Sequence, residues 1–482
     1  MLLRSTESLC PICLRRIPAK IVGESDDNVY MEKSCPTHGF FKVLVWKGIK
    51  SWILWNELND WEPERLEGER GVTELNEGCP FDCGLCPQHL RAACIVVAEI
   101  TNRCNLNCPV CFASANERYV YDASIDTVED MFKTVLYYEC KSTVPTVQIS
   151  GGEPTIRDDL PQIVAMAKRL GIEHVMVNTN GVRIAKDKKF LRSLKESGVS
   201  VIYLQFDGVT DDVYLRLRGA SLVDVKVKAI KNCADVGVGV VLVPTVVKGV
   251  NFHQIGDIVR FAKKWIPTVR GVHFQPISYL GRHPFQPDND SRITIPDMLK
   301  AIEEQTGGEV RANNFVPINL GRGCESHCSF TNVSILTEGE NLLPITDFPS
   351  EDDLLKNKGR NASIGPKHAR KEIKEYWKSV SDSACTCSCK FYTGDFGELA
   401  ECLQEYYLSI SGMPFQDVWN IDISRCKKCC IHLVAPDGRI IPFCTFNITS
   451  VKGETLYRDQ VYKGYAVSEA QRCRVSCTRA QN

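Results

Sequence analysis

The sequence has no excess of charge of either sign and no long apolar run. Its 482 residues include 58 Lys and Arg against 59 Asp and Glu, which gives a formal net charge of -1. Without a long basic tract, such a chain creates no general field for nucleic acid, and we expect none as a partner. No stretch reaches the roughly 18 apolar residues of a membrane span, and residues 1–7 lack the apolar core of a signal peptide. We therefore expect a cytoplasmic protein.

Cysteine, by contrast, is abundant, with 24 residues in the chain. In a large intracellular protein this number argues against disulfides and for metal or cluster ligation. The length and the 44% of hydrophobic residues suffice for about two to four domains with a full core. Most cysteines fall in short groups. Cys140, Cys233 and Cys402 stand alone on helix-like segments, and we expect them to be buried small hydrophobes rather than ligands.

Three cysteines, Cys104, Cys108 and Cys111, follow the apolar run 95–100 with the spacing C-x3-C-x2-C. Three thiolates on one loop can hold three irons of a 4Fe-4S cube and leave the fourth iron open to a small ligand. A zinc knuckle or chance clustering is the alternative. The spacing resembles that of radical S-adenosylmethionine (SAM) enzymes. This resemblance implies that SAM occupies the open position through its amino and carboxylate groups.

Strand-like and helix-like segments alternate over the next part of the chain, as in a parallel sheet built from βα units. The strands are expected at 95–100, 146–150, 174–178, 201–206, 238–243 and 272–275. The helices are expected at 128–139, 160–170, 187–197, 222–236 and 254–266. Six units are fewer than the eight of a closed barrel, so the pattern predicts an α/β fold with an open, partial (β/α)6 TIM-like barrel.

Chemistry should collect where these parallel strands end. After the second strand stand Gly151, Gly152 and Glu153, which allow a ligand close to the backbone and offer a carboxylate, although a Gly-Gly pair alone is an ordinary turn. In radical SAM proteins the matching residues receive the methionyl amino group. Asn180 and Gln205 could contact SAM or form Asx-type turns. Thr245 and Gln275 are weaker candidates. Arg216 and Arg218 lie where a guanidinium could meet a carboxylate, but we expect them on a solvated surface.

Two cysteine groups precede the barrel. Cys10, Cys13, Cys35 and His38 form paired knuckles, which suit Zn(II) or a single rubredoxin-like iron, unless His38 only packs and another residue is the fourth ligand. A second group is predicted to hold a closed auxiliary 4Fe-4S cluster, with zinc as the alternative; its members are Cys79, Cys83, Cys86 and Cys94. Between the groups we expect a helix that packs a tryptophan face on the neighbouring domain, from Trp46, Trp52, Trp55 and Trp61.

The cysteines of the C-terminal part predict another cluster, and their spacing leaves two sets of ligands open. Our first choice combines Cys324 and Cys328 with Cys429 or Cys430 and with Cys444, around a hairpin turn at 436–439. The second choice is a local set of Cys426, Cys429, Cys430 and Cys444. A third group is predicted to be a surface loop, comprising Cys385, Cys387 and Cys389, while Cys473 and Cys477 are expected in the tail.

Taken in order, these motifs resemble the archaeal tetraether lipid synthases over nearly the whole chain, a group that also contains proteins described as pterin methyltransferases of methanogens. The resemblance implies a radical SAM barrel at 95–280, a rubredoxin- or zinc-like module at 1–60, an auxiliary cluster module at 61–94 and a C-terminal cluster domain at 281–482. One departure is Val110, because the residue before the third cysteine is often aromatic in radical SAM enzymes.

The implied activity is hydrogen abstraction from unactivated carbon, followed by coupling of the ends of two isoprenoid lipid chains, with a reducing electron donor and contact with the membrane surface. The implied cofactors are SAM, one radical SAM 4Fe-4S cluster, two auxiliary clusters and one mononuclear iron or zinc. Two alternative functions belong to other classes of protein. Radical methylation of a pterin or another small molecule predicts a compact polar cavity, and a non-enzymatic iron-sulfur or zinc module predicts no SAM cleavage.

Overall fold

The computed structural model describes residues 1–58, 73–91, 93, 95–117, 119–138, 146–285, 287–318, 325–336, 340–344, 346 and 406–465. Several residues named above therefore lie outside the described residues. They are Trp61, Cys94, Cys140, Cys324, Cys385, Cys387, Cys389, Cys402, Cys473 and Cys477.

The N-terminal module is a four-stranded antiparallel sheet of β1 (Leu2–Leu9), β2 (Arg16–Gly23), β3 (Asn28–Cys35) and β4 (Gly39–Lys47), paired in chain order. Alternate residues of β2 and β3 are buried, as expected of strands with one face against the protein. Helix α1 (Ile49–Glu57) follows and buries Trp52 and Trp55. Trp52 stacks on His327 with ring centroids 4.9 Å apart, so the helix packs its tryptophans on the body of the protein, as expected. Trp46 is not on this helix but on β4, where it is buried as well.

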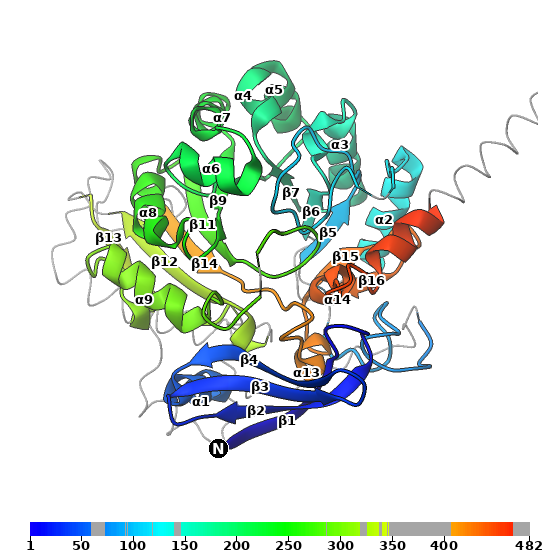
Figure 1. The fold of residues 1–482 in the computed structure, drawn as a ribbon. Helices are drawn as coiled ribbons and strands as arrows, with labels where there is room; N and C mark the ends of the chain where they lie inside the picture. The colour runs from blue at the N-terminus through cyan, green and yellow to red at the C-terminus, as the bar shows by residue number, and fades with distance from the viewer. Residues whose placement is uncertain are drawn as a thin grey trace, which may run out of the picture.

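The barrel strands are β5 (Ile95–Glu99), β6 (Thr146–Ser150), β7 (His174–Thr179), β8 (Val201–Gln205), β9 (Gly239–Val243) and β11 (Val269–Pro276). They pair in parallel in this order, which confirms the predicted α/β fold with its βα units. Around them lie α2 (Ile125–Tyr138), α3 (Leu160–Leu170), α4 (Val182–Lys186), α5 (Lys188–Glu196), α6 (Asp211–Arg218), α7 (Val223–Val236) and α8 (Ile255–Lys264) (Figure 1). The short strand β10 (Thr245–Val246) pairs with β11.

The segment after residue 280, expected to form a domain of its own, adds strands to both edges of the barrel sheet. At one edge β14 (Tyr407–Gly412) continues the sheet parallel to β11, followed by β12 (Phe330–Leu336) and β13 (Leu342–Pro344). At the other edge β15 (Ile431–Val434) lies parallel to β5 and pairs with β16 (Ile440–Pro442). Helices α9 (Ile295–Gln305), α13 (Ile423–Cys426) and α14 (Phe443–Asn447) complete this part.

In the view of Figure 1 the N-terminal sheet lies below the barrel, next to α9 and α13. Buried polar contacts join the two parts: Lys33 Nζ donates to the carbonyl oxygen of Val418 at 3.0 Å, and Arg4 forms an ion pair with Asp422. One large hydrophobic core runs from the N-terminal sheet through the barrel to the C-terminal strands. Among the described residues, no helix combines the length and the apolar character that crossing a bilayer requires.

Candidate active site

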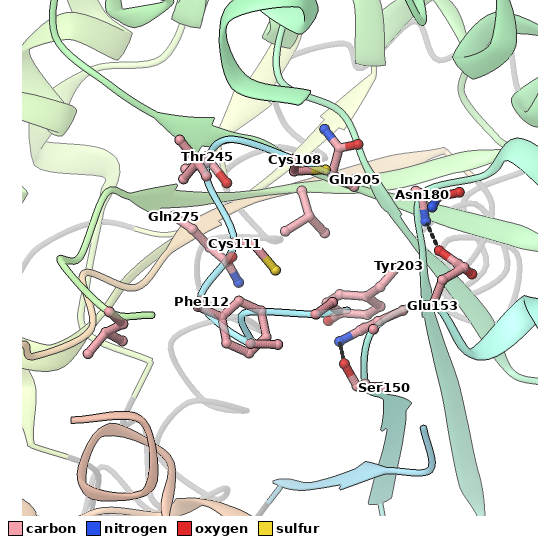
Figure 2. A pocket seen from close by; sticks show the side chains of 18 of the residues that line it. Cys108, Cys111, Phe112, Ser150, Glu153, Asn180, Tyr203, Gln205, Thr245 and Gln275 are labelled. Carbon is pink, nitrogen blue, oxygen red and sulfur yellow. Dashed lines mark hydrogen bonds between the residues drawn. The ribbon is translucent and has the colours of Figure 1, made fainter. Parts of the chain in front are cut away.

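The loop after β5 carries Cys104, Cys108 and Cys111 to the edge of one cavity of about 240 Å³. Figure 2 shows Cys108 and Cys111 beside Phe112, Gln205 and Thr245. Burial raises the pKa of the Cys104 thiol to about 12, and it also raises the pKa of Cys108. A bound iron would displace the protons of these thiols and bind the thiolates. Three converging thiols on an open cavity fit a 4Fe-4S cube with one iron left for a ligand.

Gly151 and Gly152 let the loop after β6 pack directly on the cysteine loop. A Cβ atom on Gly151, whose φ is +134°, would lie 2.1 Å from the carbonyl oxygen of Thr101, and one on Gly152 would lie 2.3 Å from that of Arg103. Backbone bonds close this contact, since Gly152 N donates to Thr101 O at 2.8 Å. The pair is therefore more than an ordinary turn, because it sets the distance between the cysteines and the β6 loop.

Glu153 is fully buried, and its carboxylate is already surrounded by donors from the protein. Oε1 accepts from Thr155 N at 3.0 Å and from Thr179 Oγ1 at 2.7 Å, while Oε2 accepts from Asn180 N at 2.7 Å. Burial raises the pKa of this carboxyl, and these bonds oppose the rise. Glu153 thus ties the ends of β6 and β7 together. Its direct contact with a ligand amino group stays a prediction.

Asn180 and Gln205 both line the cavity, at the ends of β7 and β8. Asn180 Nδ2 donates to Asn105 Oδ1 at 2.7 Å, and its Oδ1 accepts from Val182 N at 3.0 Å, so the expected Asx turn is present. Gln205 Oε1 accepts from Lys226 Nζ at 2.7 Å. Thr245 and Gln275 also reach the cavity wall. A contact of any of these residues with SAM stays a prediction.

The expectation of a solvated Arg218 is wrong. Its side chain is only 10% exposed and pairs with the fully buried Asp207, through Nε to Oδ2 at 2.6 Å and Nη2 to Oδ1 at 2.8 Å. The α6 helix turns this arginine inward at its last residue, toward the strand ends. Single-residue patterns do not reveal such a pair, because Asp207 and Arg218 meet only when β8 and α6 are folded together.

Lys226, on α7, was missed by sequence reasoning as well. It has no exposed surface, and its Nζ donates to the carbonyl oxygen of Asn180 at 2.6 Å in addition to Gln205. Burial lowers its pKa to about 7. A signal existed: Lys226, Ala229, Ile230 and Cys233 repeat with the helical period on the buried face of α7. The expectation that Cys233 is buried is confirmed.

The four predicted ligands of the N-terminal module lie together. One donor atom from each of Cys10, Cys13, Cys35 and His38 falls within 4.8 Å of all the others. His38 Nδ1 is 3.5 Å from both Cys10 Sγ and Cys35 Sγ. Although burial opposes it, hydrogen bonds from Thr37 and His38 lower the pKa of Cys35 to about 6. Three sulfurs and one imidazole at this spacing fit one tetrahedral ion.

The cysteines of the second group, Cys79, Cys83 and Cys86, are buried together, and Thr445 Oγ1 donates to Cys83 Sγ at 3.6 Å. Cys79 packs in one apolar cluster with Cys426, from the C-terminal part of the chain. Their association with Cys94 in one cluster stays a prediction, because Cys94 lies outside the described residues. Cys426 is a neighbour that local spacing could not reveal.

The C-terminal cysteines share a second cavity, lined by Cys328, Cys426, Cys429, Cys430 and Cys444. This cavity therefore brings together cysteines from both of the ligand sets that the sequence suggested for the C-terminal cluster. Cys430 lines the same cavity, and its assignment as a cluster ligand stays a prediction. Donors reach the remaining sulfurs: Arg425 Nη2 is 3.0 Å from Cys328 Sγ, and Gln416 N is 3.3 Å from Cys444 Sγ. Burial raises the pKa of Cys444 to about 12.

Three apolar side chains, Phe415, Ile431 and Phe443, line both cavities and form the partition between them. The rings of Phe415 and Phe443 have centroids 4.5 Å apart, and the ring of Phe112 lies 5.6 Å from that of Phe443. Another part of the wall of the first cavity is polar. There Gln148 Nε2 donates to Asn178 Oδ1 at 2.6 Å, and Asn178 Nδ2 donates to Ser150 Oγ at 3.3 Å.

Two family descriptions match the chain: the radical SAM superfamily over residues 98–262, and the HMPTM N-terminal zinc ribbon domain over residues 2–47. A 7,8-dihydro-6-hydroxymethylpterin dimethyltransferase of Methanocaldococcus jannaschii is 38% identical over 96% of both chains. An Fe-coproporphyrin III synthase of Methanosarcina barkeri is 34% identical over 43% of this chain and 50% of its own.

Among solved structures, Streptococcus suis SuiB bound to its precursor peptide SuiA is 19% identical, with a TM-score of 0.37 over 45% of this chain and 46% of its own. The superfamily match covers the three-cysteine loop and the strands β6, β7, β8 and β9, which contribute to the wall of the first cavity. This chain is therefore a radical SAM enzyme that uses SAM and a 4Fe-4S cluster, and it belongs to the same family as the pterin dimethyltransferase of M. jannaschii.

Proposed function

We propose that this enzyme methylates an unactivated carbon of a pterin or a similar nitrogen heterocycle. The observation that carries the proposal is the polar part of the first cavity's wall, where Gln148 and Ser150 on β6 lie beside Asn178 on the neighbouring strand β7. Amides offer both donors and acceptors, which suit the alternating ring nitrogens and oxo groups of such a substrate. The near full-length similarity to the pterin dimethyltransferase supports the same substrate class.

When bound, SAM and the reduced cluster would supply a radical that removes a hydrogen atom from the substrate carbon. A second SAM would give its methyl group to that carbon and leave as S-adenosylhomocysteine, so each methylation would use two electrons. The work of the chain is to hold the reacting carbon next to the cysteine loop and to exclude water. Phe112 and Phe443 close one side of the cavity, while Gln148 and Asn178 can orient a flat ring on the other. An electron donor must supply the reducing electrons.

A second candidate is the coupling of two isoprenoid lipid chain ends, and the apolar partition favours it. Phe415, Ile431 and Phe443 offer a hydrocarbon surface that extends from the SAM cavity to the C-terminal cysteine cavity. A chain end placed there would lie between the two sites without unpaired polar groups. This reaction would bring the enzyme to the membrane surface to collect its substrate.

One experiment separates the two reactions. Anaerobically reconstituted full-length protein is incubated with SAM and a strong reductant, either with 7,8-dihydro-6-hydroxymethylpterin or with an archaeal diether lipid. Substrate-dependent 5'-deoxyadenosine and a mass gain of methyl groups in the pterin arm support the first proposal. Coupled lipid in the other arm, without any methylated pterin, overturns it in favour of the second.

Two variants sharpen the assignment. Gln148→Leu removes the amide that donates to Asn178, and it should lower pterin methylation about tenfold without affecting lipid coupling. Phe443→Ala opens the apolar partition and should lower lipid coupling about tenfold, with a smaller effect on a pterin. If the protein forms no 5'-deoxyadenosine with either substrate, both proposals are refuted.

A further inference from the structure

Two arginines bracket the short stretch from Cys108 to Cys111. Arg218 Nη1 donates to the carbonyl oxygen of Val110 at 2.9 Å, and Arg282 Nε donates to that of Cys108 at 2.8 Å. The backbone of Arg282 also pairs with Cys111 in both directions, with both N to O distances at 2.9 Å. Three carbonyl groups of this stretch are thus bound by two residues that come from α6 and from the segment after β11.

The chain lets Arg282 come this close through a glycine. Gly281 has φ +59°, and a Cβ atom there would lie 2.4 Å from the carbonyl oxygen of Phe112 and 2.6 Å from that of Cys111. A side chain at this position would push the cysteine loop away from the arginine. The local backbone is therefore built for contact between Arg282 and the loop.

The two guanidinium groups differ in how completely they are paired. Arg218 is locked by the buried Asp207 and by Thr245 Oγ1 at 2.9 Å. Arg282 has a half-exposed partner, Glu117, and its Nη2 is buried without a hydrogen-bond partner within the described part of the chain. Nη2 shares one edge of the planar guanidinium with Nε, which bonds the Cys108 carbonyl. The Arg282 guanidinium thus places an unpaired N–H donor and a positive charge beside the cysteine loop.

The positive charge of the two arginines should raise the reduction potential of a cluster bound to the loop. The potential of an iron-sulfur cluster depends on nearby charge and on hydrogen bonds around its sulfurs. Reduction adds a negative charge, and a buried cation at short distance stabilises that charge.

The geometry points to Arg218 and Arg282 as positioning residues that fix the cysteine loop and make its cluster easier to reduce. Arg282 carries the larger share, because its counter-ion Glu117 is the more exposed of the two, with a side chain 40% exposed against 0% for Asp207. This inference rests on the radical SAM cluster and is independent of the substrate.

The test is a redox titration of the reconstituted full-length protein, followed by electron paramagnetic resonance of the signal that changes when SAM is added. For Arg282→Gln we expect the ratio of reduced to oxidised cluster at a fixed potential to fall about tenfold, which is 59 mV for one electron. Arg282→Lys keeps the charge and should stay within about twofold of the wild type, with some loss of iron. Arg218→Gln should move in the same direction as Arg282→Gln.

Glu117→Gln should shift the ratio of reduced to oxidised cluster in the opposite direction, because it removes the counter-ion and keeps both arginines. Removing the counter-ion should raise the same ratio severalfold, and this variant decides the matter if Arg282→Gln fails to take up iron. The matched control is Arg216→Gln, because Arg216 lies on the same helix as Arg218 and donates outward to Gly249 O at 2.7 Å. Ratios within twofold of the wild type in both Arg282→Gln and Glu117→Gln, or shifts of equal sign, would overturn the inference.

Discussion

The N-terminal knuckles and the loop after β5 use the same residue type for opposite purposes. Cys10, Cys13, Cys35 and His38 place four donor atoms within 4.8 Å of one another, which completes the coordination of a tetrahedral ion. Cys104, Cys108 and Cys111 give three thiols at the edge of a cavity of about 240 Å³. Four close donors leave a metal no free position, whereas three thiols on a cavity leave room for a ligand. The number of donors and the space beside them separate a structural site from a reactive one.

The side chains around the two sites also differ: those near the N-terminal site hold parts of the chain together, and those near the loop after β5 face a cavity. The N-terminal site sits in a small antiparallel sheet, and Lys33, close to Cys10, donates its ammonium protons to Ser8, Leu9 and Val418. These are contacts that join two parts of the chain. The loop after β5 is surrounded by charged and polar side chains from five strand ends, among them Glu153, Gln205 and Asp207. This comparison predicts a graded set of effects on the formation of 5'-deoxyadenosine.

The largest effect should come from the reactive loop itself. In a Cys104→Ala, Cys108→Ala, Cys111→Ala variant, we expect SAM cleavage to fall to background and the iron content to fall by about four atoms per chain, because the cube loses all its protein ligands. Iron and sulfide analysis and chromatography of 5'-deoxyadenosine measure both. Cys233→Ala, at a lone buried cysteine on α7, is the control for thiol loss. Cleavage above background in the triple variant would contradict the reactive role of this loop.

The next effect tests the spacing between the cysteine loop and the β6 loop. Gly152→Ala places a Cβ 2.3 Å from the carbonyl oxygen of Arg103, so the two loops must separate. A shift of about 1 Å in an active site can cost about 100-fold in rate, and we expect a loss of that size in SAM cleavage. Gly464→Ala, at a glycine with open space around it, is the matched control. Wild-type cleavage by Gly152→Ala would mean that the close approach is not needed.

The differences between these sites also explain what the sequence alone could predict. The knuckles and the three-cysteine loop are local patterns, so their spacing identifies them before folding, and the alternation of apolar residues predicts β5 to β9 within one or two residues. The pair of Asp207 and Arg218 and the contact of Cys426 with Cys79 join segments that are far apart in sequence or lie on different elements. The insertion of β14 and β15 at opposite sheet edges is equally non-local.

A smaller effect should follow from substitution of Lys226, which hydrogen-bonds two residues of the cavity wall. Lys226→Met removes the donor to Asn180 O and Gln205 Oε1, two acceptors that are partly buried at the wall of the cavity. An unpaired buried acceptor costs about 1–3 kcal/mol, and we expect about a tenfold rise in the KM for SAM with less change in kcat. Lys228→Met, at an exposed lysine of the same helix, is the control. An unchanged KM would mean that Lys226 serves only to fill the helix interface.

The smallest effect on cleavage should come from the N-terminal site, and here stability should suffer instead. Cys13→Ser removes one of four ligands, so the ion should bind weakly and the sheet that it holds together should unfold more easily. We expect the first thermal unfolding midpoint to fall by about 10 °C, with less than a threefold loss of 5'-deoxyadenosine formation at 25 °C. Metal analysis and calorimetry measure the first change. Ser5→Ala, at a residue of β1 in the same sheet, is the control. If Cys13→Ser abolished SAM cleavage while the protein stayed folded, the ion would take part in the reaction, and the division between a closed structural site and an open reactive one would fail.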